Sequence, residues 1–138
     1  MIIISQPKLE VRENEVLVSS CIEDDKKHFR ETIFYKTSAA YGPYAVTEKA
    51  DLFVLSALIP ALFSQSDIRV EGTLSSDLKY TLENGLIYIL AKTYGVRPIK
   101  VHAERIETFE FGGKAVGAGC SMGVDSLATI KQHYIDAV

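Results

Sequence analysis

The sequence has few of the residues that build metal sites and disulfide frameworks. It contains two cysteines, Cys21 and Cys120, and three histidines, His28, His102 and His133. Neither cysteine has a second thiol or an imidazole at the spacing of metal ligands, and the histidines are equally isolated. We therefore expect no metal site made of thiols or imidazoles, and a reducing, cytoplasmic setting.

Long apolar runs and an excess of basic charge are also missing. No apolar run approaches the roughly 20 residues of a membrane-spanning helix, and the apolar start of the chain is too short for a signal peptide and lacks its basic residues. The net charge is −3 and the isoelectric point is near 5.6. The composition thus predicts no membrane partner and gives no indication of nucleic-acid binding.

Size and composition are those of an ordinary globular domain. A chain of 138 residues with 47% hydrophobic and 24% charged residues can bury a substantial core. Alternating apolar and polar residues predict strands in its first third, at residues 2–5, 8–12, 15–21 and 29–37. Together these strands are expected to form a small antiparallel meander or hairpin sheet. A charged segment, residues 23–27, is expected to be a loop between the last two.

The middle of the chain has helical periodicity. A helix is predicted over residues 48–63, capped by Thr47. A short strand at 67–71 should end at Gly72, and Ser75 or Ser76 should cap a second helix that continues to Tyr94. Asn84-Gly85 interrupts the helical pattern, and Gly95 fits the left-handed position after the helix. Tyr41-Gly42-Pro43-Tyr44 is interpreted as a turn packed by its tyrosines, with a binding loop as the alternative.

The alternation of these elements predicts the fold class. Three further strands are expected at 99–103, 106–111 and 114–119, with Gly112-Gly113 as the turn between the last two. A final helix begins at Val124. We therefore predict an α+β (α/β) chain, with an N-terminal mixed sheet-and-helix domain at 1–112. Residues 113–138 would be the first strand, loop and helix of a doubly wound nucleotide-binding domain.

The most informative segment joins the last predicted strand to this final helix. Its sequence is Ser121-Met122-Gly123-Val124-Asp125-Ser126, and it follows the small-residue run of residues 114–120. Backbone N–H groups at a helix N-terminus lack intrahelical acceptors, and the helix dipole favours an anion there. A strand, a turn rich in hydroxyls and a helix in this order therefore predict a phosphate site.

This segment resembles the Ser-Gly-Gly-x-Asp-Ser signature of the PP-loop ATP pyrophosphatases. That superfamily includes asparagine, GMP and NAD synthetases, tRNA thiolation enzymes and deazaguanine-nitrile synthases. The resemblance covers six residues and the flanking strand and helix, and it departs from the signature at Met122, where the family has its first glycine. That glycine lets the backbone approach phosphates closely.

The resemblance implies an enzyme that splits ATP into AMP and pyrophosphate with Mg²⁺. It adenylates an oxygen of an acceptor, and a nitrogen or sulfur nucleophile then displaces AMP. Ser121 and Ser126 would hydrogen-bond phosphate oxygens, the N–H groups of Gly123 and Val124 would cradle the pyrophosphate, and Asp125 would order the loop or approach Mg²⁺. An adenylating ligase, an amidotransferase-like enzyme and a thiolation enzyme all fit, and the acceptor is not identified.

The resemblance also carries expectations about the chain as a whole. Because one strand, one loop and one helix do not make a doubly wound domain, we expect the N-terminal portion of a longer protein that is inactive by itself. ATP and Mg²⁺ would be bound by the longer protein, and weakly or not at all by this portion. A built-in glutaminase of the asparagine-synthetase type requires a cysteine after the initiator Met, and Ile2 stands there. The apolar stripe of the last helix would pack on the N-terminal domain, pair with another copy in a homodimer, or fray.

Three other interpretations share these residues. Gly119-x-Ser121-x-Gly123 has the form of a serine-hydrolase elbow with Ser121 as nucleophile, but the acids and the histidine that follow lie on the same short helix. A dinucleotide-binding loop would need one residue fewer between its glycines. A non-catalytic binding or dimerisation domain stays open as the alternative to an enzyme.

Overall fold

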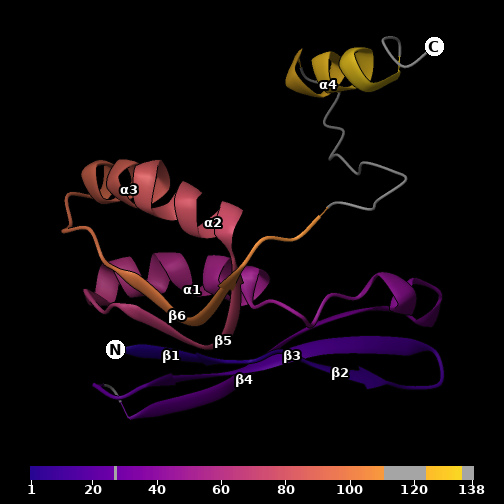
Figure 1. The fold of residues 1–138 in the computed structure, drawn as a ribbon, viewed down its shortest axis with the longest axis horizontal. Coiled ribbons are helices and arrows are strands. Elements are labelled where there is room, and N and C mark those ends of the chain that lie inside the picture. Colours follow the sequence, from indigo (N-terminus) through magenta and orange to yellow (C-terminus); the bar gives the residue numbers. More distant parts are fainter. Residues whose placement is uncertain (27, 111–123, 135–138) are drawn as a thin grey trace.

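The computed structural model describes residues 1–26, 28–110 and 124–134 (Figure 1). Its strands are β1 (Ile2–Ser5), β2 (Lys8–Val11), β3 (Glu15–Asp24), β4 (Phe29–Ser38), β5 (Ile68–Ser75) and β6 (Val101–Glu107). Its helical elements are η1 (Ala39–Tyr44), α1 (Asp51–Ser64), α2 (Ser76–Thr81), η2 (Leu82–Leu86), α3 (Ile87–Tyr94) and α4 (Val124–Tyr134). The described elements form an α+β fold, as predicted.

All six described strands belong to one mixed sheet. β1 and β2 follow one another along one side of β3, both antiparallel to it, and β4 pairs with the other side of β3. β5 pairs parallel with β1, and β6 pairs parallel with β5. The predicted antiparallel meander is therefore confirmed for β2, β3 and β4, whereas β1 pairs with β3 and not with β2. β3 also continues to Asp24, into the segment expected as a loop. Parallel strands require crossovers, and the helices between β4 and β6 provide them.

The helices α1, α2 and α3 lie on one side of the sheet (Figure 1). β1 and β5 send alternate residues toward this side, and all of these are buried. They pack against the apolar residues of α1. The buried residues of α1 are Phe53, Val54, Ala57, Leu58, Ala61 and Leu62. On the opposite face Arg69, Glu71 and His102 are exposed, so the core lies between the helices and one face of the sheet.

The second helical segment confirms three predictions. The Ser75 hydroxyl accepts a hydrogen bond from the Leu78 N–H at 3.2 Å and caps α2. Gly95 ends α3 with a left-handed φ of 66°, a conformation that glycine adopts without strain. Between them η2 is a π-helical turn that contains Asn84-Gly85, the dipeptide predicted to interrupt the helix.

The start of α1 differs from the prediction. The helix begins at Asp51 after an Ala50 cap, and Thr47 does not cap it. The Thr47 carbonyl instead accepts a hydrogen bond from Gln6 Nε2 at 2.5 Å, and the Ala50 N–H donates to the Thr73 carbonyl at 2.9 Å. The residues before the helix are thus held to the sheet by partners distant in sequence, which local periodicity does not reveal.

Two strand predictions were also wrong. Gly72 lies inside β5 and does not end it, because pairing with β6 continues to Ser75 across a register shift between Val70 and Thr73. Residues 99–111 were expected to form two strands, but the described part forms the single strand β6. The predicted strand at 114–119, the Gly112-Gly113 turn and the domain boundary near 112 lie outside the described residues.

No described helix is long and apolar enough to cross a membrane.

Candidate phosphate site and tyrosine pocket

The predicted phosphate residues fall at the start of α4. Val124, Asp125 and Ser126 form the first turn of this helix, whereas Ser121 and Gly123 lie outside the described residues. The Asp125 side chain is exposed, and its carbonyl accepts a hydrogen bond from Thr129 Oγ1 at 2.9 Å. Ser126 is only 9% exposed. A first helical turn presents N–H groups that have no intrahelical acceptor, so this turn is suited to an anion.

A second group of polar residues lies where the parallel strands end. Asp51, in the first turn of α1, accepts hydrogen bonds from the Ser75 N–H at 2.9 Å and the Ser75 hydroxyl at 2.5 Å. Ser75 ends β5 and caps α2, and Asp51 lies in the first turn of α1. The Asp51 carboxylate therefore joins the N-termini of α1 and α2 to the carboxyl end of β5. In open α/β sheets, ligands bind outside the carboxyl ends of the strands.

Gln6 holds the neighbouring strand end in place. Its Oε1 accepts a hydrogen bond from the Thr73 N–H at 3.0 Å, while its Nε2 donates to the Thr47 carbonyl. A Cβ at Gly72 would collide with the end of the Gln6 side chain, so a larger residue there would have to displace Gln6 from its hydrogen bond to Thr73. Arg105 Nε donates to Thr73 Oγ1 at 3.1 Å and extends the network to β6.

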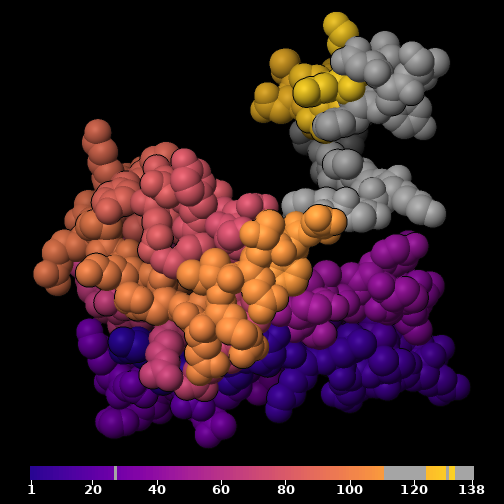
Figure 2. Space-filling model, viewed as in Figure 1, coloured from indigo at the N-terminus to yellow at the C-terminus, as the bar shows by residue number. Residues whose placement is uncertain are grey.

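Lys49 connects this edge to the chain segment that leaves the sheet. Its Nζ lies 3.4 Å from Asp51 Oδ2 and 4.8 Å from the centre of the Phe109 ring. Figure 2 shows residues 100–110, in orange, running across the molecule between the helices and the purple segment that includes residues 40–50. Phe109 follows the end of β6, and Asp51 binds Ser75 at the end of β5. The Lys49 ammonium group therefore lies between the carboxyl ends of these two parallel strands, against the Phe109 ring.

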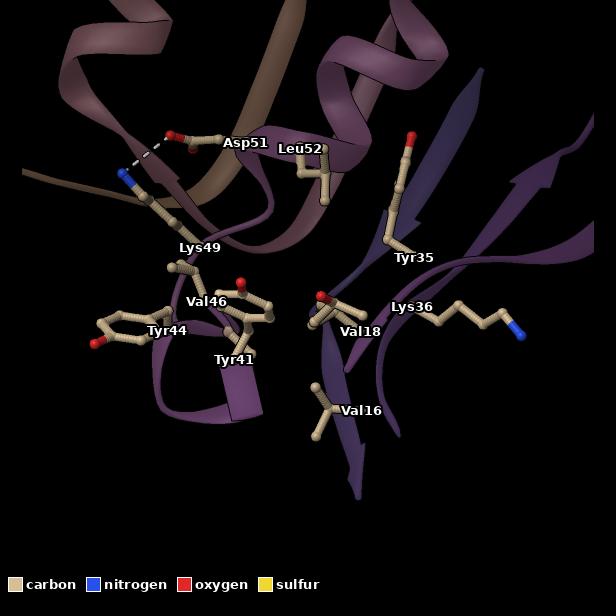
Figure 3. A pocket seen from close by; sticks show the side chains of 12 residues that line it. Val16, Val18, Tyr35, Lys36, Tyr41, Tyr44, Val46, Lys49, Asp51 and Leu52 are labelled. Atoms are coloured by element: carbon tan, nitrogen blue, oxygen red, sulfur yellow. Dashed lines mark ion pairs between the residues drawn. The ribbon is translucent and has the colours of Figure 1, made fainter. Parts of the chain in front are cut away.

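A cavity of about 400 Å³ opens beside this edge, between the β3–β4 hairpin and the start of α1. We call it the tyrosine pocket, because Tyr35, Tyr41 and Tyr44 line it together with apolar side chains, as Figure 3 shows. The other lining residues are Val16, Val18, Lys36, Thr37, Ala45, Val46, Lys49, Asp51 and Leu52. Its size and mostly apolar lining are those of small-molecule sites.

The exposure of its two tyrosines bears on the predicted packing of the Tyr41–Tyr44 turn. This segment forms η1, but Tyr41 is 60% exposed and Tyr44 79% exposed. The turn is therefore not packed by its tyrosines, contrary to the favoured interpretation. Tyr35 is fixed more firmly, because its hydroxyl lies 2.6 Å from Ser56 Oγ and its ring meets Phe53 edge-on with centroids 5.8 Å apart.

Charged residues on the opposite face of the sheet form an ion-pair cluster. Glu15 binds Lys36 Nζ at 3.2 Å and Arg12 Nη1 at 3.2 Å, and Arg12 Nε also binds Glu10 at 2.8 Å. The hydrogen bond from Lys36, with a further one from Arg12, holds the pKa of Glu15 below its ordinary value. These exposed pairs set the charge of the surface and make no catalytic arrangement.

The metal-ligating side chains of the described residues are scattered. Within residues 1–26, 28–110 and 124–134, no three His, Cys, Asp or Glu side chains come together as a metal site. Asp125 is an exposed carboxylate. Mg²⁺ beside a nucleotide is usually bound through one or two carboxylates, substrate phosphates and water.

The polar residues at the strand ends were not predicted from the sequence. Gln6, the Lys49–Asp51 segment and Ser75 are drawn together from three separate segments, and only Ser75 had a local signal, as a helix cap. The tyrosine pair around Gly42-Pro43 was the one sign of the neighbouring cavity.

Comparisons with known proteins give no family. No protein-family model matches the chain, and no curated protein matches it. One solved structure that resembles it is a Fowlpox virus resolvase in complex with Holliday junction DNA, with 13% sequence identity and a TM-score of 0.21 over 98% of this chain and 86% of that one. A similarity of this degree supports no inference about the function of this protein.

Proposed function

We propose that this chain is the N-terminal portion of an ATP-dependent synthetase-like protein of the PP-loop type, and that residues 121–126 form its phosphate site. The observation that carries the proposal is that α4 begins at Val124, directly after Ser121-Met122-Gly123. The signature residues Val124, Asp125 and Ser126 therefore occupy a first helical turn, where N–H groups are available to an anion.

Each residue has a definite part in this proposal. The first-turn N–H groups and the hydroxyls of Ser121 and Ser126 bind phosphate oxygens. The exposed Asp125 carboxylate approaches Mg²⁺ through water or directly. The acceptor oxygen attacks the α-phosphorus of ATP and takes the adenylyl group, while the bond to the β-phosphate breaks and pyrophosphate leaves. A nitrogen or sulfur nucleophile then displaces AMP from the acceptor. The protein acts by positioning the phosphates and neutralising their charge, which is the main requirement of phosphoryl-type transfer.

The mixed sheet contributes a separate surface. The tyrosine pocket adjoins the carboxyl edge of the parallel strands, where Lys49 lies against Phe109. We propose the tyrosine pocket as the place where the acceptor is held. Its apolar and aromatic lining favours an acceptor with a planar, weakly polar part.

Thermal stability in the presence of nucleotides tests the phosphate site. A ligand that binds only the folded state increases the free energy of unfolding, by about 2.7 kcal/mol when its concentration is a hundred times Kd, and so raises the melting temperature. We expect Mg²⁺ with ATP or pyrophosphate to raise the melting temperature of the 138-residue chain, and Asp125→Ala and Ser126→Ala to abolish the rise. Asp77→Ala is the matched control, since Asp77 is an exposed acidic residue in the first turn of another helix, α2. No rise in the wild-type chain, or an equal rise in all variants, would exclude this site.

A non-catalytic association domain is the second candidate. One observation favours it: β4 is an edge strand that pairs only with β3 among the described residues. A chain that dimerises and gives no thermal response to ATP, AMP or pyrophosphate would have this function instead.

A further inference from the structure

The outer edge of β4 is a long unpaired strand edge. β4 pairs with β3 over its whole length, from Phe29 opposite Asp24 to Ser38 opposite Glu15, without a bulge. In the described structure no strand pairs with its other side. Its outward N–H and C=O groups are therefore available to another extended strand.

β4 lacks most of the features that protect an edge from pairing. It contains no proline and no glycine, and its ladder with β3 is regular. Aromatic side chains are exposed on both of its faces: Phe29 and Tyr35 on the helix side and Phe34, 55% exposed, on the other. Long, flat edges with exposed apolar side chains are the ones that associate.

Its basic residues are already neutralised within the chain. Arg30 forms an ion pair with Glu23 at 3.0 Å, and Lys36 forms one with Glu15 at 3.2 Å. Both acidic partners lie on β3, so these pairs leave the outer edge of β4 open. The two basic charges of β4 therefore act as local pairs with little net field, and Glu31 is the remaining charged side chain of the strand.

From these features we infer that β4 pairs antiparallel with β4 of a second copy of this chain, about a two-fold axis at Phe34, and joins the two sheets into one. Opposed residues in an antiparallel ladder share a face, so only registers that join residues of like face are allowed. The register centred on Phe34 places Ile33 opposite Tyr35, Thr32 opposite Lys36 and Glu31 opposite Thr37, with no like charges opposed.

Neighbouring registers are less favourable. With the two-fold axis at Ile33, Arg30 of each copy would lie opposite Lys36 of the other copy. Like charges directly opposite one another destabilise a ladder. Axes at Thr32 or Tyr35 shorten the ladder. A second copy fits better than an unrelated strand because this register complements itself, as a two-fold interface requires.

Light scattering coupled to size exclusion measures this association. We expect a mass of twice 15.3 kDa for the wild-type chain at micromolar concentrations. Phe34→Lys should weaken the dimer at least about tenfold, because it opposes two new charges at the axis. Tyr88→Lys is the control, since Tyr88 is a similarly exposed aromatic residue on α3 and should leave the mass unchanged. Circular dichroism verifies that both variants are folded.

Cysteine cross-linking tests the register independently of stability. In a background with Cys21→Ser and Cys120→Ser, Phe34→Cys should form a disulfide-linked dimer under mild oxidation, since opposed Cα atoms lie about 4.5–5.5 Å apart. Thr32→Cys should not, because its two copies would lie about four residues apart along the strands, roughly 13 Å. A monomer at all concentrations, or a dimer that is unaffected by Phe34→Lys and gives no Phe34→Cys cross-link, would overturn the inference.

Discussion

Asp51 gives the sharpest prediction about stability. Its carboxylate accepts two hydrogen bonds from Ser75 and lies 3.4 Å from Lys49 Nζ. Asp51→Ala removes all three interactions and leaves the N–H of Ser75, a residue 5% exposed, without its acceptor. The same hydroxyl of Ser75 caps α2, so the change also loosens that cap.

The expected magnitude follows from the contacts. A hydrogen bond to a charged group contributes about 1.5–3 kcal/mol, and a partly exposed ion pair contributes under about 1 kcal/mol. Because the two Ser75 bonds share one carboxylate, their losses are not additive. We expect Asp51→Ala to lower the free energy of unfolding by about 3 kcal/mol. With a urea m-value of about 1.5 kcal/mol per molar for a protein of this size, the unfolding midpoint should fall by about 2 M.

Urea unfolding followed by far-UV circular dichroism measures this change. Asp51→Asn keeps one acceptor and should show about half of the loss. Asp77→Ala removes an exposed acidic residue from the first turn of α2 and should move the midpoint little. If Asp51→Ala unfolds at the same urea concentration as Asp77→Ala, the reasoning about the strand ends is wrong.

Two further predictions concern the sheet. Gly72→Ala should lower the free energy of unfolding by about 1–3 kcal/mol, because the new Cβ displaces Gln6. In a double-mutant cycle measured by urea unfolding, Gly72→Ala combined with Gln6→Ala should cost less than the sum of the two single changes. Additive costs would refute the contact. Because the pKa of Glu15 is lower in the folded chain, the ionised Glu15 side chain stabilises the fold at pH values above its unfolded pKa, near 4.5. This contribution to stability is lost as the pH falls through the folded pKa. The difference in urea midpoint between the wild type and Glu15→Gln should therefore be largest above about pH 5 and shrink toward pH 3; a difference that is constant with pH would contradict the assigned ion pair with Lys36.

Local signals predicted much of the fold. The alternation in β3 and β4, the Ser75 cap and Gly95 at the end of α3 all depend on residues close in sequence, and the structure confirms them. Even the π-helical turn occurs where Asn84-Gly85 weakened the helical pattern.

Long-range contacts explain what the sequence could not reveal. The start of α1 depends on hydrogen bonds from Gln6 to Thr47 and from Ala50 to Thr73, which join segments distant along the chain. Gly72 was interpreted as a strand end, but its role is to make room for Gln6 inside β5. The network at Asp51 was missed for the same reason, since Ser75 is its partner only in the folded chain. The assignment of the phosphate loop to residues 121–126 stays a prediction from the sequence.

Calorimetric titration of Mg²⁺-ATP into the wild-type chain and the Met122→Gly variant, side by side, tests the proposed phosphate site most directly. The glycine restores the one signature position at which the loop departs from the PP-loop pattern. Our account predicts measurable binding to the wild type and binding at least about tenfold tighter to Met122→Gly, because a glycine lets the backbone approach the phosphates. No heat of binding in either protein would contradict it.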